Sequence, residues 1–294
     1  MATADPGQVP GTAGAKTMPG VVEPARPAFY GPPASIPATP GTIIRSEPAS
    51  YLLDPLGLST GIATATKVMY ASKDRLGRPI AVTGIVIVPK ARWLGWSPRP
   101  LISYAAGTQG MADRCAPSRQ MAEGAQYEIR GFGGLVTSGY AEMTDYQGLG
   151  TPGSHTYMNR VAQGRAVLDM ARAAQRLSGS GLSASSPLGI LGYSHGGGAA
   201  AAAAELQPAY APELQLKGVS AGAVPADLAA VGKNLDGGLF AAFLGYATVG
   251  LAAGYDIDAA PNLNAAGAQY ATESQFFFSA RFNGLPQWGN CGWF

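Results

Sequence analysis

One serine carries the residue pattern in this chain that is best suited to covalent chemistry. Residues 192–196 read GYSHG, which fits the G-x-S-x-G pattern with Ser194 at its centre. A serine hydroxyl in such a pattern attacks carbonyl carbons when it is held on a sharp turn between a strand and a helix. The chemistry to expect is acyl transfer through a serine nucleophile.

The residues around Ser194 supply the strand and the helix that such a turn needs. Residues 188–191 form a short apolar run, and 199–204 are all alanine, which strongly favours a helix. The backbone N–H of His195 then lies at a helix N-terminus, where it can stabilise a developing oxyanion. A structural glycine-rich turn is the alternative interpretation, and the strand–turn–helix context favours the nucleophile.

A second match to the same pattern serves as a control. Residues 218–222 read GVSAG and also follow an apolar segment, with Ser220 at the centre. Pro225 comes soon afterwards, and the residue before a proline avoids helical backbone angles. No helix can begin directly after Ser220, so this match predicts an ordinary strand end.

Only two histidines and two cysteines are available for further chemistry: His155, His195, Cys115 and Cys291. They do not make a set of four ligands with zinc-like spacing, so no metal site is expected. We expect His195 to be a partly exposed residue at a helix start. His155 lies in a loop at the catalytic edge and is better placed than His195 for a general base, although a solvated loop histidine is the more common outcome. The two cysteines could form one disulfide or remain two buried thiols.

Composition favours a large globular core and excludes several partners. The 294 residues are 47% hydrophobic and 13% charged, and the net charge is +2 without any basic run. The overall composition therefore predicts no nucleic-acid partner and indicates no strongly anionic one. The first 20 residues lack the apolar core of a signal peptide.

The elements that must position Ser194 follow from the apolar patterns. We expect strands at 62–71, 79–89, 101–106, 140–146 and 214–221, and helices at 118–130, with Ser118 as N-cap, and at 157–177. From residue 101 onward strands and helices alternate, which predicts an α/β fold with a mostly parallel sheet. In such sheets ligands gather at the carboxyl ends of the strands, where Ser194 lies.

The ends of the chain differ from its centre. Residues 1–40 are rich in proline and are expected to be a tail that wraps the domain from about Phe29 onward. Residues 41–224 are expected to be the core, and 225–294 a helical cap with a divergent C-terminus. Residues 237–255 carry no charge, so they could be a membrane span or apolar helices covering an active site. Four internal glycines and the absence of positive flanking residues favour the cap, and no stable membrane insertion is expected.

Taken together, the motifs resemble those of the secretory lipase family, the lipase A-type triacylglycerol lipases of fungi and actinobacteria. The resemblance runs from about residue 40 to about residue 269 and rests on 41–47 (GTIIRSE), 102–104 (ISY), 115–118 (CAPS), 144–150 (TDYQGLG), 192–197 (GYSHGG), 210–214 (YAPEL) and 263–264 (LN). It implies an α/β-hydrolase fold with a helical cap inserted after the 214–221 strand. It also implies hydrolysis of acylglycerols or other carboxylic esters, a lipid or ester substrate, no cofactor, and secretion.

The resemblance also implies roles for single residues. Ser194 matches the family's nucleophile, and His195 supplies one backbone N–H of the oxyanion hole. Gln109 is the best match for the second oxyanion residue. Members of the family commonly form a disulfide bond between the cysteine after this loop and a cysteine in the cap. The resemblance therefore implies a Cys115–Cys291 disulfide.

The remaining members of the triad are not found where the resemblance puts them. The family's acid and histidine follow the cap, yet no histidine follows His195 in this chain. We therefore expect a C-terminally truncated lipase or esterase whose last strands are missing. The alternatives are a catalytically inactive lipase-like protein that binds lipid or a partner, an α/β-hydrolase peptidase, and a protein anchored through 237–255.

Overall fold

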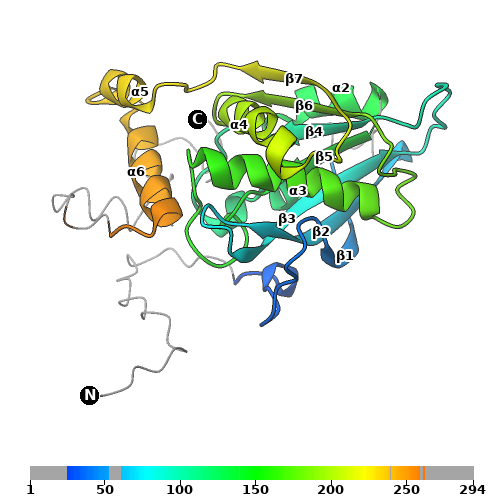
Figure 1. The fold of residues 1–294 in the computed structure, drawn as a ribbon, viewed down its shortest axis with the longest axis horizontal. Helices are drawn as coiled ribbons and strands as arrows, with labels where there is room; N and C mark the ends of the chain where they lie inside the picture. Colours follow the sequence, from blue (N-terminus) through cyan, green and yellow to red (C-terminus); the bar gives the residue numbers. More distant parts are fainter. Residues whose placement is uncertain (1–24, 53–60, 139, 239, 259–260, 262–294) are drawn as a thin grey trace.

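The computed structural model describes residues 25–52, 61–138, 140–238, 240–258 and 261 (Figure 1). The expectations for residues 1–24, for Cys291 and for most of the segment after 258 lie outside these ranges. The strands are β1 (Ile43–Ala49), β2 (Ala63–Lys73), β3 (Pro79–Pro89), β4 (Leu101–Ala105), β5 (Tyr140–Thr144), β6 (Leu188–Tyr193) and β7 (Leu216–Gly222). The α-helices are α1 (Pro117–Glu123), α2 (Ile129–Ser138), α3 (Arg160–Arg176), α4 (His195–Tyr210), α5 (Leu228–Leu235) and α6 (Ala241–Tyr255), with short 3₁₀ helices η1 (Ala28–Tyr30) and η3 (Asp113–Cys115).

The described strands form one sheet in the order β1-β2-β3-β5-β4-β6-β7. The pairs β5–β4, β4–β6 and β6–β7 are parallel, whereas β1, β2 and β3 join antiparallel to one another and to β5. Strand β2 is antiparallel to β3, and β3 is antiparallel to β5, so β2 runs in the same direction as β5. Five of the described strands therefore run in one direction: β2, β5, β4, β6 and β7. The predicted α/β-hydrolase fold with a mostly parallel sheet is confirmed, and the antiparallel strands are confined to one side of it.

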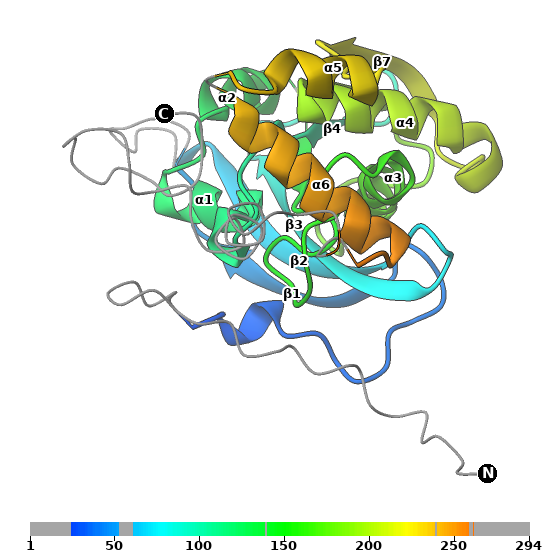
Figure 2. The same cartoon turned by 90° about the vertical axis from the view of Figure 1, so that its left-hand side faces the viewer.

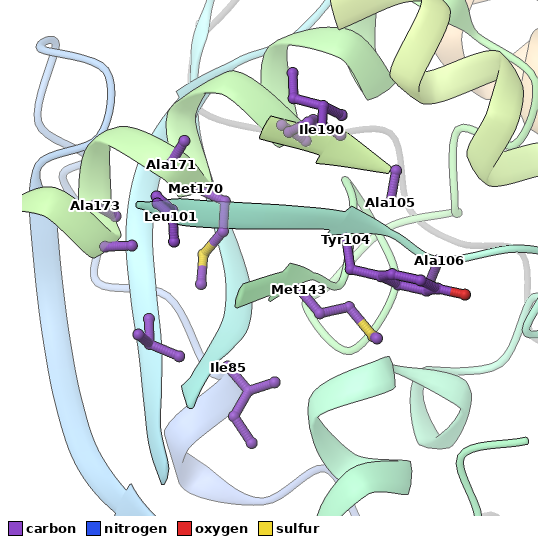
Figure 3. Packing of buried hydrophobic residues seen from close by; sticks show 14 of the residues in the cluster. Ile85, Leu101, Tyr104, Ala105, Ala106, Met143, Met170, Ala171, Ala173 and Ile190 are labelled. Carbon is purple, nitrogen blue, oxygen red and sulfur yellow. The ribbon is translucent and has the colours of Figure 1, made fainter. Parts of the chain in front are cut away.

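Helices cover both faces of this sheet (Figures 1 and 2). On one face, the Tyr104 ring of β4 meets the Phe132 ring of α2 edge-on, with centroids 5.8 Å apart. On the other face, α3 and α4 pack closely, because a side chain on Gly164 would come within 2.9 Å of the Ala202 backbone. The apolar residues of β4, β5 and β6 lie between the two helical layers and form the core around Leu101, Met143 and Ile190 (Figure 3).

The predicted helix over 118–130 is wrong in extent. The chain instead forms α1, which ends because Gly124 takes a left-handed conformation at φ 70°, and then a separate helix α2. Ser118 is also not the N-cap, since α1 begins one residue earlier at Pro117. The predicted helix over 157–177 is confirmed as α3, with the Asn159 side chain capping its first turn.

The chain already packs against the domain before residue 41, as expected for the tail from about Phe29 onward. Phe29 and Tyr30 are buried, and the Lys67 ammonium lies 4.8 Å from the centre of the Phe29 ring. The Tyr30 hydroxyl bonds to the Ser118 hydroxyl at 2.8 Å. These contacts fasten the segment before β1 to β2 and α1.

Two helices follow β7, as predicted for the 225–294 segment. Helix α6 packs on the chain that leads into α3: a side chain on Gly250 would come within 2.4 Å of the Tyr157 backbone, and one on Gly254 within 2.4 Å of the Asn159 side chain. The internal glycines of 237–255 therefore permit close packing onto the protein. Of the helices in the described ranges, none has the length and apolar character needed to cross a membrane. That residues 225–294 form a cap separate from the core stays a prediction.

A buried carboxylate joins α1 to the sheet. Asp145, at the end of β5, has no solvent exposure and accepts hydrogen bonds from the Ser118 N–H at 2.7 Å, the Ser118 hydroxyl at 2.5 Å and the Thr83 hydroxyl at 2.7 Å. Burial raises the pKa of Asp145 to about 6, although the hydrogen bonds from Ser118 and Thr83 oppose that shift. Asp145 thus takes the capping role that the sequence analysis gave to Ser118.

Replacing Asp145 by alanine should lower the free energy of unfolding by about 3 kcal/mol, because three donors lose their buried acceptor. The matched control is Asp227→Ala, which removes the exposed N-cap acceptor of Ala230 N–H in α5 and should cost about 1 kcal/mol. Urea unfolding followed by circular dichroism measures both. Equal losses in the two variants would contradict the role given to Asp145.

Candidate active site

Ser194 lies between the end of β6 and the start of α4 in a backbone conformation that residues with a side chain rarely adopt. Its φ is 57° and its ψ is −121°. The Ser194 N–H donates to the Gly222 carbonyl at 2.9 Å, and the Ser194 carbonyl accepts from the Gly198 N–H at 3.0 Å. The side chain is partly exposed. This strained, hydrogen-bonded turn is the geometry of a nucleophile elbow.

The glycines of the motif are required by close backbone contacts. A side chain on Gly196 would lie 2.0 Å from the Ala105 carbonyl oxygen of β4, and one on Gly192 would lie 2.2 Å from the Gly196 carbonyl oxygen. Next to them, a side chain on Gly197 would lie 2.1 Å from the Gly222 carbonyl oxygen of β7. The start of α4 therefore rests directly on the backbone of three neighbouring strands.

The second match to the motif has none of this geometry. Residues 218–222 lie within β7, Ser220 pairs with Leu191 of β6 and is exposed, and no atom lies within 4 Å of a side chain placed on Gly218. The prediction of an ordinary strand is confirmed.

The loop that follows β4 lies beside the elbow, where the sequence analysis placed the second oxyanion residue. A side chain on Gly107 would be 3.4 Å from the Tyr193 carbonyl oxygen. Gln109 is buried, and its amide group donates to the Gly107 carbonyl and to the Glu128 carboxylate, both at 3.2 Å, and accepts from Gln126 at 3.1 Å. Because this side chain is held inside the protein, an oxyanion role for Gln109 has to rest on its backbone N–H.

Glu128 holds this loop and was missed by the sequence analysis. Its carboxylate accepts from the Gly107 N–H at 2.9 Å, from the Gln109 amide and from the Tyr104 hydroxyl at 3.1 Å. Burial raises the pKa of Glu128 to about 7, against the opposing effect of these hydrogen bonds. A lone glutamate 21 residues after Gly107 has no sequence signal that would connect it with the loop.

Both histidines are buried, contrary to the expectation of exposed rings. The His195 ring stacks on the Tyr157 ring, with centroids 4.5 Å apart, and its Nε2 atom meets the Gln163 amide. The His155 ring lies 5.6 Å from it, and its Nδ1 atom bonds to the Gln147 carbonyl at 3.1 Å. His195 points inward because the first turn of α4 faces α3, which carries Gln163.

Burial keeps both imidazoles neutral at pH 7. It lowers the pKa of His155 to about 4 and that of His195 to about 3, with the neighbouring His155 adding to the effect of burial on His195. A neutral imidazole is the form that accepts a proton. However, the His155 ring bonds to the Gln147 carbonyl and the His195 ring bonds to the Gln163 amide, so neither of these hydrogen bonds is with Ser194. The use of His155 as a base stays a prediction.

Cys115 is buried in η3, just after the loop that carries Gly107 and Gln109. Its predicted partner Cys291 lies outside the described residues, so the Cys115–Cys291 bridge stays a prediction. Over the described ranges, His, Cys, Asp and Glu side chains do not gather into a group of three or more that could hold a metal ion.

Comparison with known proteins finds a family model and relatives that are named lipases. The family model described as "Secretory lipase" matches residues 117–274. A Mycobacterium tuberculosis protein named "Probable inactive lipase MT1628" is 35% identical over 231 residues, covering 74% of this chain and 49% of that protein. "Lipase 10" of Candida albicans is 30% identical over 248 residues, covering 80% of this chain and 52% of that protein. The chain thus spans about half the length of these curated relatives.

Solved structures show the same fold. Candida antarctica lipase A in its closed state superimposes with a TM-score of 0.72 at 24% identity, over 85% of this chain and 58% of that one. The rice cell wall degrading esterase LipA from Xanthomonas oryzae superimposes with a TM-score of 0.58 at 20% identity, over 74% of this chain and 61% of that one.

The elbow can be tested with two matched glycine substitutions. Gly196→Ala should lower the free energy of unfolding by about 3 kcal/mol, because the new methyl group collides with the Ala105 carbonyl. Gly218→Ala, in the second motif, has open space and should change it by less than about 0.5 kcal/mol. Urea unfolding measures both, and a tolerated Gly196→Ala would show that the close backbone contact is absent.

The buried imidazoles should make stability fall in acid. Below pH 6.5 an unfolded histidine takes up a proton, whereas folded His155 resists it until pH is near 4, so stability is lost over that interval. Burial raises the pKa of Glu142 to about 8, so this group makes the protein more stable as the pH falls. Wild type is therefore compared with His155→Gln, because both proteins contain Glu142. The wild type should lose about 1.4 kcal/mol more per pH unit between pH 6 and 4.5. Parallel pH curves for the two proteins would contradict a neutral, buried His155.

Proposed function

The chain belongs to the secretory lipase family, and on that premise we propose that Ser194 is the nucleophile of a hydrolase acting on carboxylic esters, including acylglycerols. The observation that carries the proposal is the strained backbone of Ser194 at the junction of β6 and α4. Such strain persists only where the surrounding structure enforces it, and it is concentrated at functional sites. Ser220, with the same flanking glycines, lies in an ordinary strand.

The proposed reaction uses side chains and backbone groups alone. The Ser194 oxygen attacks the ester carbonyl carbon, and the carbonyl oxygen becomes an oxyanion held by the backbone N–H groups of His195 and Gln109. Collapse of this intermediate releases the alcohol, which takes up the proton that the general base removed from Ser194, and leaves an acyl-enzyme that water then hydrolyses to the free acid. The N-terminus of α4 favours the negative charge at the first of these two N–H groups.

A general base must remove the proton of Ser194, and this step separates two candidate functions. Both imidazoles of the chain are bonded to glutamine residues. This favours a second candidate, a catalytically inactive lipase-like protein that binds lipid or a partner. The 35% identical relative is itself named a probable inactive lipase. Secretion and a lipid substrate are proposals that rest on the family.

A fluorophosphonate probe tests the nucleophile. We expect slow phosphonylation, located by mass spectrometry on the peptide that carries Ser194, because oxyanion donors assist the attack even where the base is missing. Ser194→Ala should abolish the labelling. The matched control Ser220→Ala removes the serine of the second motif and should leave it unchanged.

Turnover tests whether this chain supplies its own general base. For the chain as printed we expect negligible hydrolysis of short-chain p-nitrophenyl esters. Turnover that is abolished by Ser194→Ala and lowered as much by His155→Ala would establish an active enzyme with His155 as base. A protein in which the probe does not label Ser194 would be an inactive lipase-like protein.

A further inference from the structure

The segment that joins β3 to β4 lies far from Ser194. It comprises residues 90–100, here named the tryptophan loop, and reads KARWLGWSPRP. The end of β3 pairs with the beginning of β5, and β4 begins beside the beginning of β6. The tryptophan loop therefore extends from the amino ends of the parallel strands, whereas Ser194 follows the carboxyl end of β6. In Figure 1 the loop lies at the end of the sheet opposite to α6.

Two large apolar side chains of the tryptophan loop face solvent. The relative exposure of Leu94 is 86% and that of Trp96 is 107%, the highest values among the large hydrophobic residues described. Each side chain therefore lacks the stabilisation that burial of its apolar surface would provide. A pair of fully exposed apolar side chains on one loop is typical of an interaction site.

The tryptophan loop is closed by its own hydrogen bonds. The Trp93 indole donates to the Ser97 carbonyl at 2.8 Å, and its ring packs against Gly95, where a side chain would come within 2.4 Å of ring atoms. The Arg99 guanidinium donates to the carbonyls of Pro89, at 3.5 Å, and Ala91. Trp93 is thus held within the loop and is partly buried, whereas Leu94 and Trp96 are exposed. The exposure of these two side chains is part of a formed structure.

The charge of the tryptophan loop indicates what it contacts. Lys90, Arg92 and Arg99 supply three positive charges, and residues 90–100 contain no Asp or Glu. Cations beside an exposed indole match the boundary of an anionic lipid layer, where phosphate groups lie above an apolar interior and tryptophan is enriched.

We propose that the tryptophan loop docks this protein peripherally on anionic lipid surfaces, with Leu94 and Trp96 inserted among the lipids and Lys90 and Arg92 on the headgroups. Docking through this end leaves the Ser194 edge facing away from the lipid layer. It does not depend on whether Ser194 turns over esters. It also requires no membrane-spanning helix, since insertion of loop side chains is shallow and reversible.

Co-sedimentation with vesicles of phosphatidylcholine and phosphatidylglycerol tests the proposal, with pure phosphatidylcholine vesicles as the neutral reference. Wild type should bind the anionic vesicles, more weakly as salt rises. The double substitution Leu94→Ser with Trp96→Ser should lower the partition coefficient about tenfold or more. Arg92→Gln should lower it about fivefold.

Matched controls come from other exposed positions. Leu76→Ser removes an exposed leucine in the β2–β3 turn, and Lys217→Gln removes an exposed cation on β7. Neither should change vesicle binding. Absence of binding by the wild type, or equal binding by the wild type and the double variant, would overturn the proposal. Concentration-dependent self-association without vesicle binding, lost in the double variant, would also overturn it and make the loop a protein contact.

Discussion

The backbone strain at Ser194 is the constraint on which the rest of this structure depends. A non-glycine residue at φ 57° is held there only if the chain on both sides is fixed. Strand β6 fixes one side through its pairing with β4 and β7, and α4 fixes the other by resting on strand backbone. The glycines of the motif and the alanines of α4 follow from this requirement, because larger side chains would hold the helix away from the sheet.

The fold could be predicted from the sequence wherever local pattern decides the structure. The 79–89 strand has the predicted bounds, and the helix over 160–176 lies within its predicted range, because each has a strong local period. The helix over 118–130 was wrong because a single left-handed Gly124 ends it. Ser118 could not be assigned its true partner, since Asp145 lies 27 residues away and only the sheet brings the two together.

Some features of the candidate site could also be predicted from local sequence, and others could not. The elbow is encoded in five consecutive residues together with the strand and helix beside them, so Ser194 could be located without a structure. The burial of the two histidines could not, because it depends on how α4 packs against α3 and on rings contributed by Tyr146 and Tyr157. Glu128 is the clearest omission, because its hydrogen bonds to Gly107 and Gln109 exist only in the folded chain.

The contact of Gly197 with the Gly222 carbonyl has a consequence for local unfolding. Because α4 touches backbone of β4, β6 and β7 at once, the elbow cannot open unless these strands separate. The amides around Ser194 should thus exchange with solvent only in the largest cooperative opening of the protein, whereas the loop between β3 and β4 opens by itself. The strained segment around Ser194 should thus be among the last parts of the protein to unfold locally.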